Sequence, residues 1–301
     1  MRKIMVVSCL LLIVGLLVGC GERTETARYY FSPSWTNDGR IIFIGVTDSV
    51  RKDILGGQLG SSYSQYALTI YPTGTGESSS LFDLSSSTPY AMSCSPGVNY
   101  VAFMDDLRSG LFRKIIIRNI ALGQHTNLEV AELIFSPGIK SFDWSNDGTR
   151  IVYCTTQEVR IRNWNDNLGT TDTLVTAEAD LEFVSWQNGG RIACVSSSEG
   201  TFLINPGSGA RQALVGAGVV VDKPQISATD TNQIYGIMGG SYVRVNAGSG
   251  ATTEVVANFK GDLPRLFSDG KQLVYSKRDE SSGIYLISDI TASSPAETKL
   301  K

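Results

Sequence analysis

Short apolar runs separated by polar turns follow one another along most of the chain. In the recurring unit, a bulky residue precedes a polar turn, then come a basic or polar residue and three or four apolar residues. The unit begins at six positions: Trp35, Cys94, Trp144, Trp186, Ala228 and Phe267. The apolar runs are rich in Val, Ile, Tyr and Phe and are bounded by Gly, Asn, Asp and Ser, which predicts β-strands.

A second unit follows each copy of the first. An apolar strand ends at a polar residue or Pro, and in five of the six copies Gly stands four positions later: Pro72 and Gly76, Asn119 and Gly123, Asn165 and Gly169, Asn205 and Gly209, Asn246 and Gly250. Asn, Asp and Gly supply the backbone angles that tight hairpins need. Each repeat therefore predicts a meander of four antiparallel strands.

The spacing of the repeats indicates how the meanders assemble. The six starting positions lie 59, 50, 42, 42 and 39 residues apart, in the range of propeller blades. We predict an all-β fold, a six-bladed β-propeller of four-stranded antiparallel blades, as a single domain over residues 29–301. Residues 29–31 could instead close the ring by pairing with the last blade. The segment 295–300 can supply the outermost strand of blade 6, so that exchange is not required.

One turn carries a family resemblance. The sequence Trp144-Ser145-Asn146-Asp147-Gly148 resembles the turn of TolB-like propeller repeats, which belong to the WD-repeat-like group. The resemblance extends over about residues 29–300 and implies partners among the proteins of the cell envelope. The motif forms a structural turn without chemistry of its own, and such folds have many unrelated functions.

The N-terminus predicts export. Arg2 and Lys3 precede an uncharged apolar run from Ile4 to Val18, a pattern typical of a secretory signal and shorter than the roughly 20 residues of a spanning helix. The next residues, Gly19 and Cys20, complete a sequence that resembles the lipobox. We expect a cleaved signal peptide over residues 1–19, lipid attachment at Cys20 and a short tether over residues 20–28. The alternative is an ordinary N-terminal anchor with an unmodified cysteine.

The net charge and the positions of the cysteines narrow the class of protein further. Loss of Arg2 and Lys3 with the signal would lower the net charge from −3 to −5, and no basic run marks a nucleic-acid partner. Cys94, Cys154 and Cys194 lie in apolar strand-like stretches, where buried thiols are expected. The alternative is one disulfide among them, since an exported protein would fold in an oxidising compartment.

The sequence offers little for catalysis. His125 is the single histidine, and it falls in an expected hairpin turn. A multi-histidine metal site is therefore excluded, and no Gly-x-Ser-x-Gly elbow is present. The pair Asp105 and Asp106 is expected at the solvated start of a loop. We expect no catalytic residue, no metal and no cofactor.

Two long loops mark one face of the predicted ring. They run between the second and third strands of a blade, over about residues 46–66 in blade 1 and 104–114 in blade 2. Their apolar side chains are candidates for an interaction surface: Ile54, Leu55, Tyr63, Tyr66, Leu107, Leu111 and Phe112. The alternative is that these loops fold back and cap the channel or a neighbouring blade. The tether would enter on this face, which would then lie toward the membrane or toward something docked on it.

Three functions remain open after these observations. The first is a lipid-anchored, non-enzymatic platform for protein–protein interaction, a monomer exported to the periplasm-facing or cell-surface side of a membrane. The second is a propeller that binds or senses a glycan or a small molecule. The third is a propeller lyase or hydrolase, for which the chain carries no recognised motif.

Overall fold

The structure is a computed structural model, and every regular element among the residues that it describes is a β-strand. It describes residues 23–36, 38–53, 57–70, 78–84, 89–96, 100–106, 113–120, 129–135, 138–164, 172–186, 190–214, 219–277 and 282–301. Within these ranges, no helix is long and apolar enough to cross a membrane. Cys20 and the signal sequence lie outside them, as does His125.

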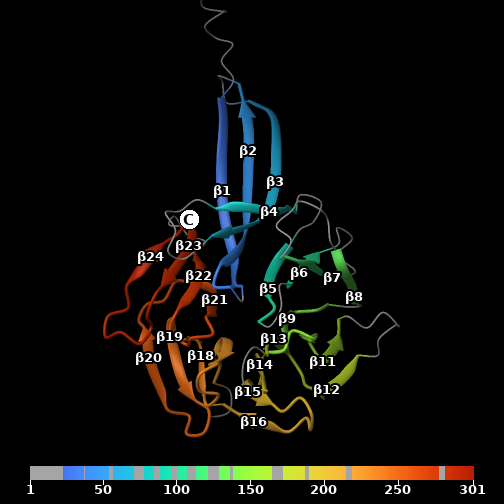
Figure 1. Ribbon diagram of the computed structural model, residues 1–301, viewed down its shortest axis with the longest axis vertical. Coiled ribbons are helices and arrows are strands. Elements are labelled where there is room, and N and C mark those ends of the chain that lie inside the picture. Colours follow the sequence, from blue (N-terminus) through green and yellow to red (C-terminus); the bar gives the residue numbers. More distant parts are fainter. Residues whose placement is uncertain are drawn as a thin grey trace, which may run out of the picture.

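In the described part of the chain, twenty-four strands form six separate sheets arranged in a ring (Figure 1). Blade 1 contains β1 (Arg23–Trp35), β2 (Ile41–Lys52), β3 (Gln58–Ile70) and β4 (Ser79–Asp83); blade 2 contains β5 (Pro89–Cys94), β6 (Tyr100–Asp106), β7 (Arg113–Asn119) and β8 (Glu129–Phe135). Blade 3 contains β9 (Ser141–Trp144), β10 (Arg150–Cys154), β11 (Glu158–Asn163) and β12 (Thr173–Ala177). Blade 4 contains β13 (Leu181–Ser185), β14 (Ile192–Ser196), β15 (Gly200–Ile204) and β16 (Arg211–Ala213). Blade 5 contains β17 (Asp222–Ile226), β18 (Gln233–Met238), β19 (Ser241–Asn246) and β20 (Thr252–Val256), and blade 6 contains β21 (Asp262–Leu266), β22 (Leu273–Lys277), β23 (Gly283–Ile287) and β24 (Glu297–Lys299).

The predicted six-bladed propeller is confirmed. Each sheet is a consecutive antiparallel meander, and the first strand of each lies innermost. The ring closes without strand exchange, because β1 pairs with β2 of its own blade and β24 pairs with β23. The alternative in which residues 29–31 pair with the last blade is therefore wrong.

Six apolar clusters, one between each pair of neighbouring blades, hold the ring together. The second strand of a blade contributes to two of them, because successive side chains point to opposite faces of a sheet. In β2, Ile44 packs with Phe103 toward blade 2, whereas Phe43 packs with Val274 toward blade 6. Both faces of these strands are buried, which explains why they are continuous apolar runs in the sequence.

The bulky residue that starts a repeat also joins neighbouring blades. Nε1 of Trp144 donates to the carbonyl of Ser93 in blade 2 over 2.9 Å, and Nε1 of Trp35 donates to the carbonyl of Arg265 in blade 6 over 3.0 Å. The second bond lies at the seam where the two ends of the chain meet. The seam therefore repeats the contact of an internal blade interface.

The hydrogen bonds and backbone angles of the turn after Trp144 explain why Ser145, Asp147 and Gly148 occur in it. Ser145 Oγ donates to Asp147 over 2.5 Å and the Thr149 amide donates to the same carboxylate over 3.0 Å, while Gly148 takes a φ of +67°. These bonds hold the pKa of Asp147 down at about 2. The motif is thus a structural turn, as its resemblance implies.

The repeats in blades 5 and 6 start earlier than expected. The strand register matches Ile226 and Leu266 to Trp35, since they pair with Ile234 and Leu273 as Trp35 pairs with Ile41. Ala228 and Phe267 therefore belong to the turns that follow. The polar turn in each repeat was recognised correctly, but its bulky neighbour was misplaced by one or two residues.

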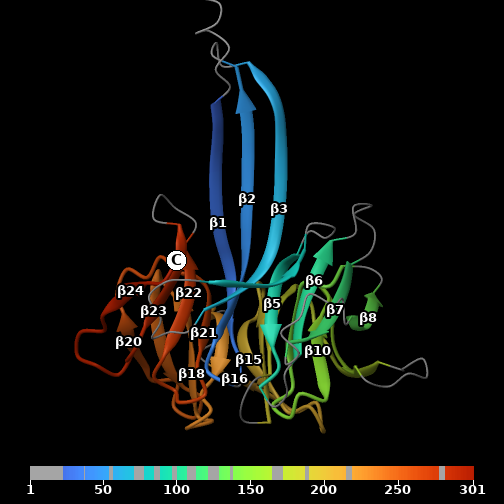
Figure 2. The same cartoon turned by 45° about the horizontal axis from the view of Figure 1, so that its top comes forward.

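Blade 1 departs from the expectation most clearly. Residues 46–66 were expected as a loop, yet most of them belong to β2 and β3, which rise far above the ring together with β1 (Figure 2). The expected tether is also largely strand, because β1 begins at Arg23. We call this projecting sheet, residues 23–31, 44–52 and 58–66, the extension. Blade 2 shows a lesser departure, since β6 reaches Asp106 and β7 begins at Arg113.

The three cysteines within the ring fulfil their expectation. Cys94, Cys154 and Cys194 are buried with free thiols. Burial raises the pKa of the Cys94 and Cys154 thiols to about 12. They act as small apolar side chains in the blade interfaces.

Candidate functional site

The extension and the mouth of the central channel lie on the same face of the ring. β1 runs from the extension down into the ring, and the other innermost strands run alongside it around the channel. The first residues of these strands therefore surround the channel on the face from which the extension rises. This face carries both candidate sites.

The extension exposes large side chains far from the core. Tyr29, Leu59, Tyr63 and Tyr66 are 49%, 50%, 55% and 37% exposed. Tyr63 and Tyr66 were predicted as interaction residues and are accessible as that prediction requires. Register puts Tyr63 beside Asp48 on one face of the sheet, and Tyr66 lies on the other.

The remaining predicted interaction residues are not described. Ile54, Leu55, Leu107, Leu111 and Phe112 fall outside the described ranges. Tyr29 and Leu59 were missed by the sequence reasoning. Tyr29 was taken only as the first residue of the propeller domain, and no local signal showed that β1 leaves the ring above Phe31.

Both long edges of the extension lack a neighbouring strand within the described chain. β1 is the first strand of its sheet, and β4 pairs with β3 only from Tyr66 to Thr69. Edge strands present unpaired N–H and C=O groups that another strand can use. Near the tip, Glu25 pairs with Lys52 at 2.5 Å and with Arg23 at 3.6 Å, and the Lys52 hydrogen bond lowers the pKa of Glu25.

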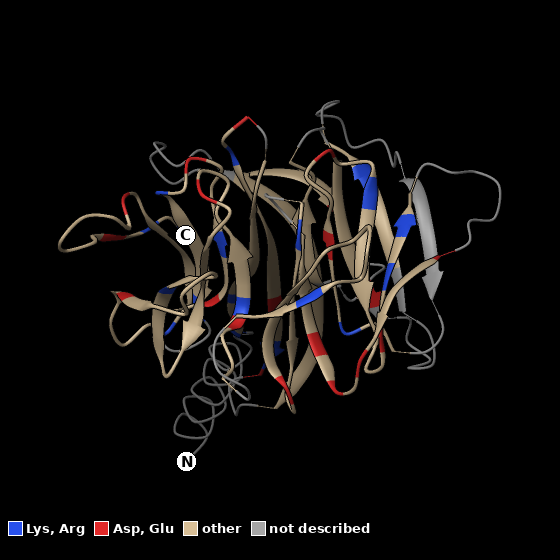
Figure 3. Ribbon diagram, turned by 90° about the horizontal axis from the view of Figure 1, so that it is seen from below, with Lys and Arg blue, Asp and Glu red and all other residues tan. Residues whose placement is uncertain are grey.

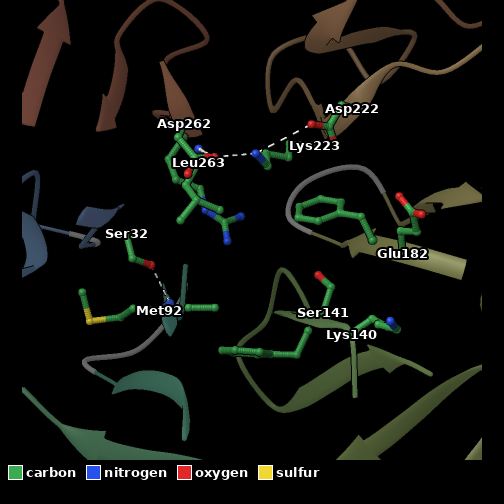
Figure 4. A pocket seen from close by; sticks show the side chains of 13 residues that line it. Ser32, Met92, Lys140, Ser141, Glu182, Asp222, Lys223, Asp262 and Leu263 are labelled. Atoms are coloured by element: carbon green, nitrogen blue, oxygen red, sulfur yellow. Dashed lines mark hydrogen bonds and ion pairs between the residues drawn. The ribbon is translucent and has the colours of Figure 1, made fainter. Parts of the chain in front are cut away.

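A cavity of about 330 Å³ occupies the mouth of the channel (Figure 4). Its walls come from the innermost strands of all six blades and the residues beside them. The lining residues are Ser32, Ala91, Met92, Lys140, Ser141, Phe142, Glu182, Phe183, Asp222, Lys223, Asp262, Leu263 and Arg265. Acidic, basic and apolar side chains therefore face one small space.

A ring of polar residues lies at the equivalent position of each innermost strand, directly before the residue that matches Trp35. We call it the channel floor, and all six members are buried: Ser34, Ser93, Asp143, Ser185, Gln225 and Arg265. Asp143 is fully buried and accepts hydrogen bonds from Ser93 Oγ at 2.8 Å, Ser185 Oγ at 2.9 Å and the Trp186 amide at 3.1 Å. The floor thus ties blades 2, 3 and 4 together through one carboxylate.

Arg265 is the cationic member of the floor and also lines the cavity. It is 8% exposed, and its Nη1 lies 3.8 Å from Asp143 Oδ1. Within the described chain, Nη1 has no hydrogen-bond partner. A buried guanidinium whose nearest carboxylate is beyond hydrogen-bond distance retains the capacity to bind an acceptor.

The wall above Arg265 carries backbone strain. Ser32, Lys223 and Leu263 each precede a proline and take φ values of +53°, +48° and +48°. The pairing register shifts at the same place in β1, β17 and β21. These blades are neighbours in the ring, so the strained positions gather on one side of the cavity. Such strain costs on the order of 1–3 kcal/mol per residue and is concentrated at functional sites.

Charged groups on this wall are already paired. Lys223 forms an ion pair with Asp262 and lies 3.7 Å from Asp222 (Figure 4). Glu182 and Lys140 stand on the opposite side, on blades 4 and 3. Over the ring as a whole, basic and acidic segments are interspersed (Figure 3).

The structure differs from the expectation that Asp105 and Asp106 lie at the solvated start of a loop. Asp105 is only 5% exposed and lies within β6. The expectation of a solvated loop start is therefore wrong for this residue. Among the described residues, no group of three His, Cys, Asp or Glu side chains is arranged to hold a metal ion.

Comparisons with known proteins establish the fold but no family. No family model matches the chain, and no curated protein matches its sequence. A solved structure of the nidogen/laminin complex is similar, with a TM-score of 0.58, 9% identity and coverage of 91% of this chain and 94% of that chain. Oligogalacturonate lyase in complex with manganese is similar with a TM-score of 0.54, 13% identity and coverage of 88% and 90%. At these identities the likeness shows a β-propeller fold alone.

Proposed function

We propose that this protein is a lipid-anchored, non-enzymatic β-propeller that serves as a protein–protein interaction platform in the cell envelope. The observation that carries the proposal is the extension, a three-stranded sheet that stands on the ring and has no buried residue above Val46 and Gln65 within the described chain. A sheet of this length with exposed tyrosines and two open edges has no role in closing the ring. The TolB-like resemblance of the turns and the similar chain in the nidogen/laminin assembly support an interaction role.

The extension also changes the expected geometry of anchoring. Cys20 precedes Arg23, the first residue of β1, by only three positions. If the lipid is attached at Cys20, the tip of the extension lies at the membrane surface. At about 3.3 Å per residue, residues 23–31 of β1 hold the ring about 25 Å from that surface. The extension is then a rigid stalk, and the channel mouth faces the membrane.

Basic groups at the tip agree with this orientation. Arg23, Arg51 and Lys52 lie near the tip, where they can approach anionic headgroups. The partner would then reach the protein in the space between ring and membrane. There it would meet Tyr29, Tyr63 and Tyr66 on the sides of the stalk.

The anchoring part of the proposal is tested with Cys20→Ser in the native host. We expect the variant to leave the membrane fraction and the detergent phase, because a lipid chain supplies the attachment. Ser208, in an exposed hairpin, provides the matched change: Ser208→Ala should leave the distribution unaltered. Persistence of Cys20→Ser in the membrane fraction would contradict lipid anchoring.

The interaction part is tested by site-specific photocrosslinking in intact envelopes. A crosslinker at position 63 or 59 should capture the same protein in repeated experiments, as these residues lie on the extension. A crosslinker at Asn146, exposed in a turn on the other face of the ring, is the control and should not capture it. Failure to recover any reproducible protein from positions 59 and 63 would overturn the platform role.

A further inference from the structure

We propose that the channel cavity is a binding site for a small monocarboxylate with an apolar body, whose carboxylate is received by Arg265. The site is independent of lipid anchoring and of the partner that the extension binds. It combines an open cavity of about 330 Å³ with a buried cation at its base. That volume is at the lower end of the range for small-molecule sites.

The floor explains why the ligand is an anion. Asp143 accepts three hydrogen bonds from neighbouring strands, and Gln225 accepts the Leu266 amide at 2.6 Å while donating to Pro264. Arg265 differs, because its buried Nη1 has no hydrogen-bond partner within the described chain. Leaving such a donor unsatisfied is costly, and a carboxylate supplies the missing acceptor.

The shape of the guanidinium favours a carboxylate. Its planar fork of N–H donors matches two carboxylate oxygens in a bidentate arrangement. Asp143 stands 3.8 Å away and does not complete such a pair. Because Arg265 lines the cavity, a ligand carboxylate that reaches its guanidinium would complete the pair without displacing Asp143 from its three donors.

The walls restrict the charge of the ligand to one. Asp222, Asp262 and Glu182 line the cavity, and Asp143 lies in its floor. These four carboxylates outnumber the three cations at the cavity, which are Lys140, Lys223 and Arg265. Lys223 is paired with Asp262 and approaches Asp222, so it does not offset a second ligand charge. A dianion such as phosphate would meet these carboxylates at close range and is disfavoured.

The apolar side chains of the cavity walls determine which ligand body fits beside the carboxylate. Met92, Phe142, Phe183 and Leu263 contribute apolar surface between the floor and the rim. A body with a flat apolar or aromatic portion buries this surface, whereas a fully hydroxylated one does not. Benzoate has this combination, and benzamide is its neutral counterpart of the same shape.

The first experiment uses the unaltered mature protein and three probes: benzoate, benzamide and inorganic phosphate. Affinities are measured by ligand-observed NMR titration. Benzoate should bind at least about tenfold more tightly than benzamide, the usual scale for a charge-assisted hydrogen bond. Equal affinity for benzoate and benzamide, or tighter binding of phosphate, would overturn the proposal.

The second experiment locates the site. Arg265→Gln should weaken benzoate binding about tenfold or more, and Arg191→Gln, the same change outside the cavity, should not. Because Arg265→Gln leaves Asp143 without its ion pair, Asp143→Asn/Arg265→Gln is measured beside it and keeps the floor neutral. Unchanged benzoate affinity in the double variant would refute the assignment, whatever the stability of the single variant.

Discussion

The extension and the channel floor are both rich in polar residues, but for opposite reasons. In the extension, Tyr63 and its serine neighbours lie above Val46, where the sheet contributes no residue to an apolar cluster, and many changes there should leave the fold intact. In the floor, Asp143 and Arg265 are buried at 0% and 8% exposure, and their bonds join separate blades. In this protein, therefore, the polarity of a residue alone does not show whether it stabilises the fold or is available to bind a partner.

The largest expected effect is on the floor. Asp143→Ala removes the acceptor of Ser93, Ser185 and the Trp186 amide and leaves Arg265 as an uncompensated buried charge. We expect a loss of about 3–5 kcal/mol in the free energy of unfolding, measured by chemical denaturation. Asp143→Asn/Arg265→Gln should recover a substantial part. An Asp143→Ala loss below about 1 kcal/mol would show that the floor does not hold the blades.

A smaller effect is expected at the seam of the ring. Trp35→Phe removes the Nε1 bond to the Arg265 carbonyl, and we expect a loss of about 1–2 kcal/mol in the free energy of unfolding. Trp144→Phe, which removes the matching bond between blades 2 and 3, is the control. If the seam is an ordinary interface, the two losses agree. A much larger loss for Trp35→Phe would mean that the seam depends on this bond.

A third and weaker effect is expected on the pH dependence of the free energy of unfolding, through Asp147. Hydrogen bonds hold the pKa of Asp147 at about 2, below its ordinary 3.8, so its ionised form stabilises the fold above pH 4. That contribution is lost as the pH falls from about 4 to 2. Because the side chain is exposed, we expect less than about 1 kcal/mol. Denaturation between pH 2 and 6 should show a shallower pH dependence for Asp147→Asn than for the unaltered chain.

The smallest effect on stability is expected in the extension. Tyr63→Ala should change the free energy of unfolding by no more than about 0.5 kcal/mol, as for other surface changes. Its crosslinking partner should nevertheless be captured less well from position 59. A stability loss comparable to that of Asp143→Ala would instead give the extension a structural role and remove the contrast with the floor.

The sequence predicted the propeller because each blade repeats the same hairpin turn. Blades 5 and 6 were aligned imperfectly, since Ile226 and Leu266 stand where Trp35 gives a stronger signal. The floor was missed for this reason: Ser34, Ser93, Asp143 and Ser185 precede correctly aligned positions and share polarity, but Gln225 and Arg265 join them only in the structural register. Aligning all six blades on that register would have found the ring.

The extension could not be recognised by the same means. Strand prediction relies on alternation between a buried and a solvated face, and above Val46 and Gln65 no described residue of the extension is buried. The segment with Ser61, Ser62 and Ser64 around Tyr63 therefore lacks that alternation and was predicted as a loop. The cavity was beyond reach as well, because its walls come from segments distant in the sequence, such as Ser32 and Asp262, which only closure of the ring brings together.

The orientation of β1 has a mechanical consequence for a tethered protein. A load applied at Arg23 would run along the strand axis, while the hydrogen bonds that join β1 to β2 lie across it. Such a load must shear many bonds at once rather than open them one after another. With the proposed lipid at Cys20, β1 would carry the load between the membrane and the ring, and the same strand is the innermost strand of blade 1.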